Sequence, residues 1–158
     1  MKYFIKEYET RYFAGIEFPN GIQLKKNDQK KIPKLWEQYF EGVSQRIKNQ
    51  VEPNHVIGLE FYPFDFKETT TYNYFALAET KDLIEAFTGV VTKKLRKGKY
   101  ICFPIKFDEI SQEIQKVYKF IKDNDIKVHR GFDYEDYLPS EDYGNPEAIL
   151  NFCLMIEE

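Results

Sequence analysis

Residues 132–143 combine the two kinds of side chain that can hold a lipophilic cation. This stretch contains five acids, three tyrosines and one phenylalanine. A carboxylate supplies the charge for a cation, and neighbouring rings supply apolar area and cation–π attraction. An acidic surface loop with exposed tyrosines has the same composition. The elements that position these residues must therefore decide between the two interpretations.

Length and composition limit the classes of protein to consider. The chain has 158 residues, 31% of them charged, and a net charge of −3, which predicts a single domain over residues 1–158 without broad attraction to DNA or anionic membranes. Its apolar runs are shorter than the roughly 20 residues of a membrane span. The start of the chain becomes charged before a signal-peptide core can form, and Cys102 and Cys153 lack partners nearby in sequence. We therefore expect a cytoplasmic protein with free thiols and no membrane partner.

The first half of the chain predicts one strand, one helix and a hairpin. Residues 2–18 alternate in polarity like a half-buried strand, and Pro33 suits the first turn of a helix. The segments 55–62 and 72–79 predict the two strands of the hairpin, with a loop between them. The helix carries an apolar stripe at helical spacing, formed by Trp36, Tyr39, Phe40, Val43 and Ile47.

The second half repeats this order of elements. Residues 90–94 and 99–107 predict strands around a basic turn, and Asp108 is a suitable N-cap for the next helix. Residues 128–137 and 148–156 predict the last two strands. The helix carries a second apolar stripe, formed by Ile110, Ile114, Val117, Tyr118 and Ile121.

A strand–helix–strand–strand unit thus occurs twice, in approximate repeats 1–80 and 88–158. Each repeat is too small to bury its own helix and strands, so the two must pack together. We expect an α+β fold with pseudo-twofold symmetry, in which an antiparallel sheet carries two helices. The pocket is expected between the repeats.

Four short strings occur in an order and spacing typical of one known family. Residues 32–36 contain Pro-x-Leu-Trp, residues 72–79 form a strand that ends in an acid, residues 98–100 are Gly-Lys-Tyr, and residues 134–137 are Tyr-Glu-Asp-Tyr. This order resembles the GyrI-like small-molecule-binding domain. That domain is the effector-binding module of multidrug-responsive bacterial transcription activators, and it also occurs as a stand-alone protein. The resemblance spans nearly the whole chain.

The resemblance implies a site around Glu135. The matching glutamate of the family lies in an aromatic pocket and pairs with cationic lipophilic ligands. Trp36 matches a tryptophan of the pocket wall, although its place in the apolar stripe predicts core packing equally well. Tyr74, Tyr137 and Phe152 are further candidates for the wall.

Two alternatives remain for the acids of this strand. Glu135 shares a face with Asp133 and Tyr137 on a strand, and it can instead be a solvated acid at the edge of the sheet. The family motif can also be aligned one step earlier, on Phe132-Asp133.

No cofactor or metal is expected. His55 and His129 are far apart and lack Cys or acid neighbours at ligand spacing, and no phosphate-binding glycine loop occurs. The basic cluster at residues 93–99 predicts a solvated turn. Since strand signals begin at residue 2 and end at 156, we expect no helix-turn-helix segment and no direct nucleic-acid partner.

The resulting hypothesis is a stand-alone binding protein for small lipophilic or cationic compounds. Sensing, sequestration or regulation of a protein partner would follow from binding, and in some GyrI-like proteins that partner is DNA gyrase. The alternative is a hydrolase of strained, cyclopropane-type compounds, in which Glu135 would be the catalytic acid or base. A third option is a protein-interaction module whose seam is filled by side chains.

Overall fold

A nine-stranded antiparallel sheet organises residues 1–157, the part of the chain that the computed structural model describes. Its order is β1-β7-β9-β8-β4-β5-β2-β6, and β3 pairs with β5. The strands are β1 (Phe4–Tyr8), β2 (Arg11–Glu17), β3 (Ile22–Gln23), β4 (Val56–Phe61), β5 (Thr71–Thr80), β6 (Val91–Leu95), β7 (Gly98–Lys106), β8 (Phe132–Tyr137) and β9 (Ile149–Met155). The helices are α1 (Ile32–Gly42), α2 (Phe66–Thr69) and α3 (Ile110–Asp123), with short 3-10 turns η1 (Leu24–Lys26), η2 (Asp28–Lys31), η3 (Ser44–Arg46) and η4 (Phe107–Glu109).

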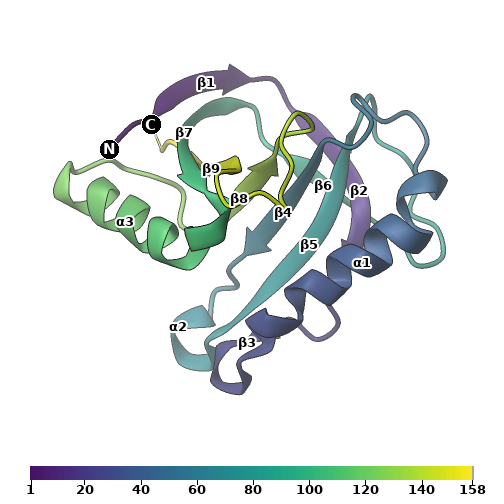
Figure 1. Ribbon diagram of the computed structural model, residues 1–158, viewed down its shortest axis with the longest axis horizontal. Helices are drawn as coiled ribbons and strands as arrows, with labels where there is room; N and C mark the ends of the chain where they lie inside the picture. Colours follow the sequence, from purple (N-terminus) through teal and green to yellow (C-terminus); the bar gives the residue numbers. More distant parts are fainter. Residues whose placement is uncertain (158) are drawn as a thin grey trace.

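Both long helices pack on the same face of the sheet. Directly paired residues of an antiparallel sheet share a face, and one such row crosses five strands. It runs through Ala76, Gly58, Glu135, Phe152 and Phe103. Ala76 belongs to the core under α1, whereas Phe152 and Phe103 belong to the core under α3. Glu135 therefore lies between the two helices, which stand on either side of β4, β5 and β8 in Figure 1.

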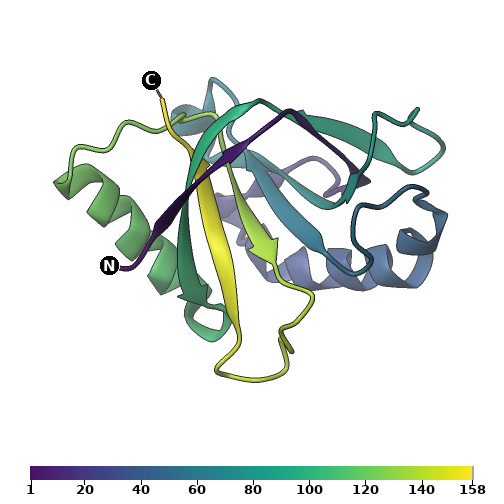
Figure 2. The same ribbon diagram turned by 90° about the horizontal axis from the view of Figure 1, so that it is seen from above.

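The opposite face encloses a third core because the sheet curls. Only residues 9–10 separate β1 from β2, and only residues 96–97 separate β6 from β7, yet each pair of strands lies at opposite ends of the sheet order. A link of two residues spans only about 7–10 Å, so the two ends of the sheet must come close together. Figure 2 shows the purple N-terminal strands crossing from the side of α3 to that of α1.

Two expectations about strands were wrong. Residues 2–18 form two strands, because the chain leaves one edge of the sheet after Tyr8 and joins the other at Arg11. The basic segment 95–98 is not a hairpin turn: β6 pairs with β2, whereas β7 pairs with β1 and β9. In both places the alternation of polarity continues across the link, so the local pattern does not reveal the change of partner.

The remaining elements match the expected order with shifted ends. α1 ends at Gly42, and the last residues of its apolar stripe, Val43 and Ile47, stay buried around η3. Asp108 lies in η4 and makes no side-chain cap, and α2 occupies part of the predicted loop between the hairpin strands. β8 begins at Phe132 because Val128 makes only an isolated bridge with Ile156.

The fold class is the predicted α+β class. The strand order is the same from both ends of the sheet when β2, β4 and β5 are matched with β7, β8 and β9, respectively. The duplication itself stays a prediction. None of the helices within residues 1–157 has the length and apolarity that crossing a membrane requires.

Candidate functional site

The carboxyl group of Glu135 lies on the helix-facing side of the sheet and accepts two tyrosine hydrogen bonds. Tyr137 Oη donates to Glu135 Oε1 over 2.7 Å, and Tyr74 Oη donates to the same oxygen over 3.0 Å. Trp36 Nε1 in turn donates to Tyr74 Oη over 3.0 Å. Glu135 is only 7% exposed. Four predicted site residues, Trp36, Tyr74, Glu135 and Tyr137, thus form one hydrogen-bonded chain, and the prediction of a solvated edge acid is wrong.

A glycine opposite Glu135 makes room for this chain. Gly58 pairs with Glu135 on β8 and with Ala76 on β5. A Cβ atom at position 58 would lie 2.2 Å from Tyr74 Oη and 2.7 Å from Glu135 Oε1. Any larger residue would therefore push the hydroxyl and the carboxylate apart.

Aromatic rings from both helical sides surround Tyr137, one of the two hydrogen-bond donors to Glu135. On the α1 side, the Trp36 ring lies 5.5 Å from that of Tyr137 and stacks on Phe40 at 5.9 Å. On the α3 side, Tyr137 contacts Phe107 and Tyr143 at 6.0 and 5.2 Å. Trp36 and Tyr137 are half-buried, so both side chains are accessible to solvent. Tyr137 contacts Glu135 directly, and Trp36 contacts its partner Tyr74.

Phe152 has a different place from the other predicted wall residues. It pairs with Glu135 across β8 and β9, is 1% exposed, and packs with the rings of the α3 core. Its ring lies 6.0 Å from Tyr118. Phe152 is therefore part of the floor beneath the site.

Two further acids lie beside Glu135: Asp133, which was predicted to share its face, and Glu60, which the sequence prediction of the site missed. Glu60 on β4 pairs directly with Asp133 on β8, on the same face as Glu135. Glu60 is 5% exposed and Asp133 is 0% exposed. The one available signal was Glu60 itself, an acid in the middle of an otherwise apolar strand. Asp133 was expected on the face of Glu135, but nothing local indicated that it would be buried.

A second set of aromatic side chains surrounds these acids. Tyr62 Oη donates to Asp133 Oδ2 over 3.0 Å, and Tyr118 Oη donates to the same oxygen. The Tyr62 ring lies 5.1 Å from Phe66 and 5.5 Å from Tyr72. The rings of these four residues are half-buried: Tyr62, Phe66, Tyr72 and Tyr118. The short helix α2 thus supplies a ring to this end of the site.

Burial and mutual repulsion favour the protonated forms of the two additional acids. Burial, followed by the charges of Glu135 and Asp133, raises the pKa of Glu60 well above 4.5. Burial also raises the pKa of Asp133 above 3.8, although hydrogen bonds to its carboxylate oppose this shift. Burial and Glu135 raise the pKa values of Tyr74 and Tyr137 well above 10.0, so both hydroxyls keep the protons that they donate.

No basic side chain neutralises the three acids within the described chain. Over residues 1–157, no lysine, arginine or histidine forms an ion pair with Glu60, Asp133 or Glu135. Buried carboxylates ordinarily have a paired cation or bind a metal. The same residues include no three His, Cys, Asp or Glu side chains placed to hold a metal ion. The three acids therefore lie together without a basic partner among the described residues.

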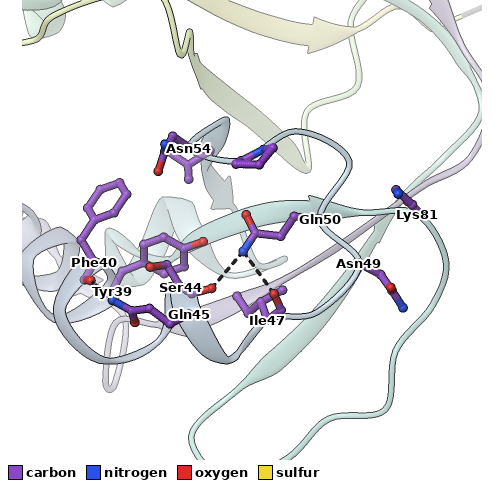
Figure 3. A pocket seen from close by; sticks show the side chains of 11 residues that line it. Tyr39, Phe40, Ser44, Gln45, Ile47, Asn49, Gln50, Asn54 and Lys81 are labelled. Carbon is purple, nitrogen blue, oxygen red and sulfur yellow. Dashed lines mark hydrogen bonds between the residues drawn. The ribbon is translucent and has the colours of Figure 1, made fainter.

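A cavity of about 500 Å³ lies at the end of α1, and its lining does not include Glu135 (Figure 3). Its lining is mainly neutral and polar, and its one charged side chain is the cation Lys81. Gln50 Nε2 spans part of it by donating to the carbonyl oxygens of Ser44 and Ile47. The cavity is lined by Tyr39, Phe40, Ser44, Gln45, Ile47, Asn49, Gln50, Pro53, Asn54, Val56 and Lys81.

The two histidines and the two cysteines lie outside the site. His55 Nε2 is 2.5 Å from Asp136 Oδ1 on the opposite face of the sheet, and His129 Nδ1 accepts from the Gly131 amide. Cys102 and Cys153 are buried free thiols.

Solved structures share this fold at low sequence identity. SAV2435 bound to tetraphenylphosphonium aligns with a TM-score of 0.74 and 16% identity, over 99% of this chain and 94% of its own. The integron cassette protein VCH_CASS2, from the mobile metagenome of Vibrio cholerae, aligns with a TM-score of 0.64 and 18% identity, over 98% and 95% of the two chains. The C-terminal domain of EcmrR aligns with a TM-score of 0.64 and 12% identity, over 99% and 98%. At these identities the likeness establishes the fold alone.

Sequence comparison identifies the family. A search of curated protein sequences finds no match to the chain. Residues 4–150 match the integron-associated effector binding proteins known as Cass2, which are GyrI-like. This match covers most of the chain and agrees with the order of short strings in the sequence. The chain therefore belongs to the Cass2 family of GyrI-like, integron-associated effector binding proteins.

Proposed function

We propose that the protein binds lipophilic organic cations between α1 and α3, with Glu135 as the anionic partner. The observation that carries this proposal is a buried carboxylate whose hydrogen-bond donors are two neutral tyrosine hydroxyls. Trp36, Tyr74 and Tyr137 would supply the aromatic contacts. Sensing or sequestration of such compounds, or regulation of a protein partner, would follow from binding.

Burial of Glu135 gives a cation a thermodynamic reason to bind. Removing a carboxylate from water costs several kcal/mol unless hydrogen bonds or an opposite charge compensate. Tyr74 and Tyr137 supply part of this compensation, and a cation would supply more. Stacking on the rings would add apolar burial and cation–π attraction.

The half-buried rings provide a route to the acid. Trp36 and Tyr137 are partly exposed and in ring contact, whereas Glu135 is almost fully buried. An entering ligand would meet these two rings first. Rotation of the Tyr137 side chain would free one hydrogen-bonding position on Glu135 Oε1 for the cation.

The family relationship supports small-molecule binding, and one structural neighbour supports the chemical class. SAV2435 is bound to tetraphenylphosphonium, which is a lipophilic cation. Cations of this type combine a delocalised positive charge with aromatic surface. They match the combination of Glu135 with the surrounding rings.

Fluorescence of Trp36 provides a direct binding assay, because it is the only tryptophan in the sequence. We expect titration with tetraphenylphosphonium to change its emission saturably. Glu135→Gln keeps the shape of the side chain and should weaken binding by about tenfold or more. The control Glu147→Gln removes an exposed acid of the same charge and should leave the affinity unchanged.

Equal affinity in the wild type and in Glu135→Gln would overturn the assignment of Glu135. The same samples also test the hydrolase alternative. Mass spectrometry should recover the compound unchanged after long incubation, whereas loss that depends on Glu135 would show catalysis.

A further inference from the structure

Two oxygen atoms beside Glu135 are buried without a hydrogen-bond partner. Glu60 Oε2 and Asp133 Oδ1 are both inaccessible to solvent and accept no hydrogen bond from an amide, hydroxyl or basic group of residues 1–157. Such groups are uncommon in folded proteins, since an unsatisfied buried acceptor costs about 1–3 kcal/mol. The two carboxyl groups lie within hydrogen-bond reach of each other, so in the free protein a shared proton can join them. Binding of one cation at Glu135 does not account for them.

The two unpartnered oxygens belong to residues that face each other. Glu60 and Asp133 are directly paired across β4 and β8, so their side chains leave the sheet side by side. Asp133 and Glu135 are two residues apart on one strand and share a face. Their Cα atoms are therefore about 7 Å apart.

The rings around Glu60 and Asp133 repeat the chemistry found around Glu135. Tyr62, Phe66 and Tyr72 form a contacting cluster at this end, and Tyr62 and Tyr118 donate to the partnered oxygen of Asp133. Each acidic group thus has tyrosine hydroxyls and half-buried rings around it. The two groups are adjacent on the sheet, so a single ligand can reach both.

We propose that Glu60 and Asp133 form a second cation subsite beside Glu135, and that the preferred ligand is an organic dication with charges about 7 Å apart. This inference rests on the proposed function, because it assigns the first charge of the ligand to Glu135. Two ammonium-type centres would each lie against rings and a carboxylate. The positive charge of the second centre would lie against both carboxylates and replace the proton that they share, which would be released to solvent.

A series of bis(trimethylammonium) alkanes tests the proposal, with alkyltrimethylammonium ions of equal chain length as single-charge references. Affinities are measured by calorimetry and by Trp36 fluorescence. In the wild type, we expect butane and hexane linkers to bind about tenfold or more tightly than their references. A decane linker should lose most of this advantage, because its charges are too far apart.

Substitutions at Glu60 and Asp133 test whether the tighter binding of dications depends on the second subsite. Glu60→Gln and Asp133→Asn keep side-chain shape and retain acceptors, and their folding is checked by thermal unfolding. Each should weaken binding of the dication several-fold more than binding of the single-charge reference. Glu135→Gln should weaken both classes of ligand. Glu147→Gln is the control for removal of an exposed acid.

The outcomes separate the two proposals. Dications that bind no better than their references at any linker length, while Glu135→Gln still weakens the references, would overturn the second subsite and leave the proposed function intact. Failure of Glu135→Gln to weaken either class would overturn the proposed function, and the second subsite with it. The linker series in the wild type gives a result even if a variant fails to fold.

Discussion

Tyrosine rings surround a cation on one face of the sheet and buried acids on the other. We call the face that carries α1 and α3 the helix face, and the opposite, concave face the curled face. On the curled face, the Arg11 guanidinium lies 3.5 Å from the centroid of the Tyr8 ring and 5.1 and 5.3 Å from those of Tyr100 and Tyr134. Arg11 also donates to Tyr134 Oη over 3.0 Å. On the helix face, Glu60, Asp133 and Glu135 lie among tyrosines, and no basic side chain of residues 1–157 pairs with them.

This difference separates a structural arrangement from a candidate binding site. The chain supplies its own cation to the rings of the curled face, and that cation helps to close the core. The rings of the helix face surround acids instead, so the matching cation must come from elsewhere. Tyr134 and Glu135 are neighbours on β8, and the strand period alone sends them to opposite faces.

Removal of the cation from the curled face should have the largest effect on stability. Arg11→Met keeps much of the apolar stem but loses the charge, its ring contacts and the bond to Tyr134. We expect unfolding in denaturant to show a loss of about 2–3 kcal/mol. Lys93→Met is the matched control, because Lys93 contacts one ring, that of Phe75, and should cost under about 1 kcal/mol. Equal losses in both variants would show that the ring cage around Arg11 adds nothing.

On the helix face, filling the space opposite Glu135 should have the next largest effect. In Gly58→Ala the new methyl group would collide with Tyr74 Oη and Glu135 Oε1. We expect a loss of about 1–3 kcal/mol in unfolding and weaker binding of tetraphenylphosphonium. Gly42→Ala, where a Cβ meets nothing within 4 Å, should instead be neutral or stabilise α1 by up to about 1 kcal/mol. Unchanged binding in Gly58→Ala would mean that the contact between Tyr74 and Glu135 is not needed.

Neutralising an acid on the helix face should stabilise the protein, in contrast to the loss at Arg11. Glu60 faces Asp133, Glu135, Tyr62 and Tyr72, and its raised pKa means that the folded state favours the protonated form. Its contribution to stability is therefore present below pH 4.5 and is lost as the pH rises through the raised pKa.

The variant Glu60→Gln removes this dependence. We expect it to be about 1 kcal/mol more stable than the wild type at neutral pH, with a smaller loss of stability on going from acid to neutral pH. Thermal unfolding across this pH range measures both effects, with Glu147→Gln as the control. A destabilised Glu60→Gln would show that the chain already compensates the charge of Glu60.

The smallest effect is expected at a partly exposed ion pair on the curled side. The hydrogen bond to Asp136 raises the pKa of His55, so the stability from this pair is present below pH 6.5 and is lost as the pH rises through the raised pKa. His55→Gln should cost a few tenths of a kcal/mol at low pH and less above the raised pKa. Melting curves of the wild type and the variant, one set below pH 6.5 and one above the raised pKa, test this prediction. A loss of stability in His55→Gln that grows with pH would contradict it.

Local patterns predicted the parts of the fold that depend on local chemistry. The two apolar stripes predicted α1 and α3, and the alternation of residues 55–79 predicted the β4–β5 hairpin. The link at residues 9–10 was missed, because the choice between the two edges of the sheet depends on partners that are distant in sequence.

The candidate site likewise has parts that local sequence predicts and parts that depend on residues distant in sequence. Glu135 and Tyr137 were predicted together because they are two residues apart on one strand. Asp133 was predicted on the same face and as the alternative position of the family motif. Glu60 was missed, because its proximity to Asp133 is set by the register between β4 and β8, which no local pattern encodes. Burial of charged side chains also contradicts their ordinary preference, so composition argues against it.

The most direct test of the account is a thermodynamic cycle between the charge at position 135 and the charge of the ligand. Calorimetry would compare tetraphenylphosphonium with uncharged triphenylphosphine oxide, in the wild type and in Glu135→Gln. We predict that the substitution weakens the cation by about tenfold or more and the neutral compound by less than about twofold. Equal weakening of both ligands, or of neither, would contradict the claim that Glu135 is the anionic partner of a bound cation.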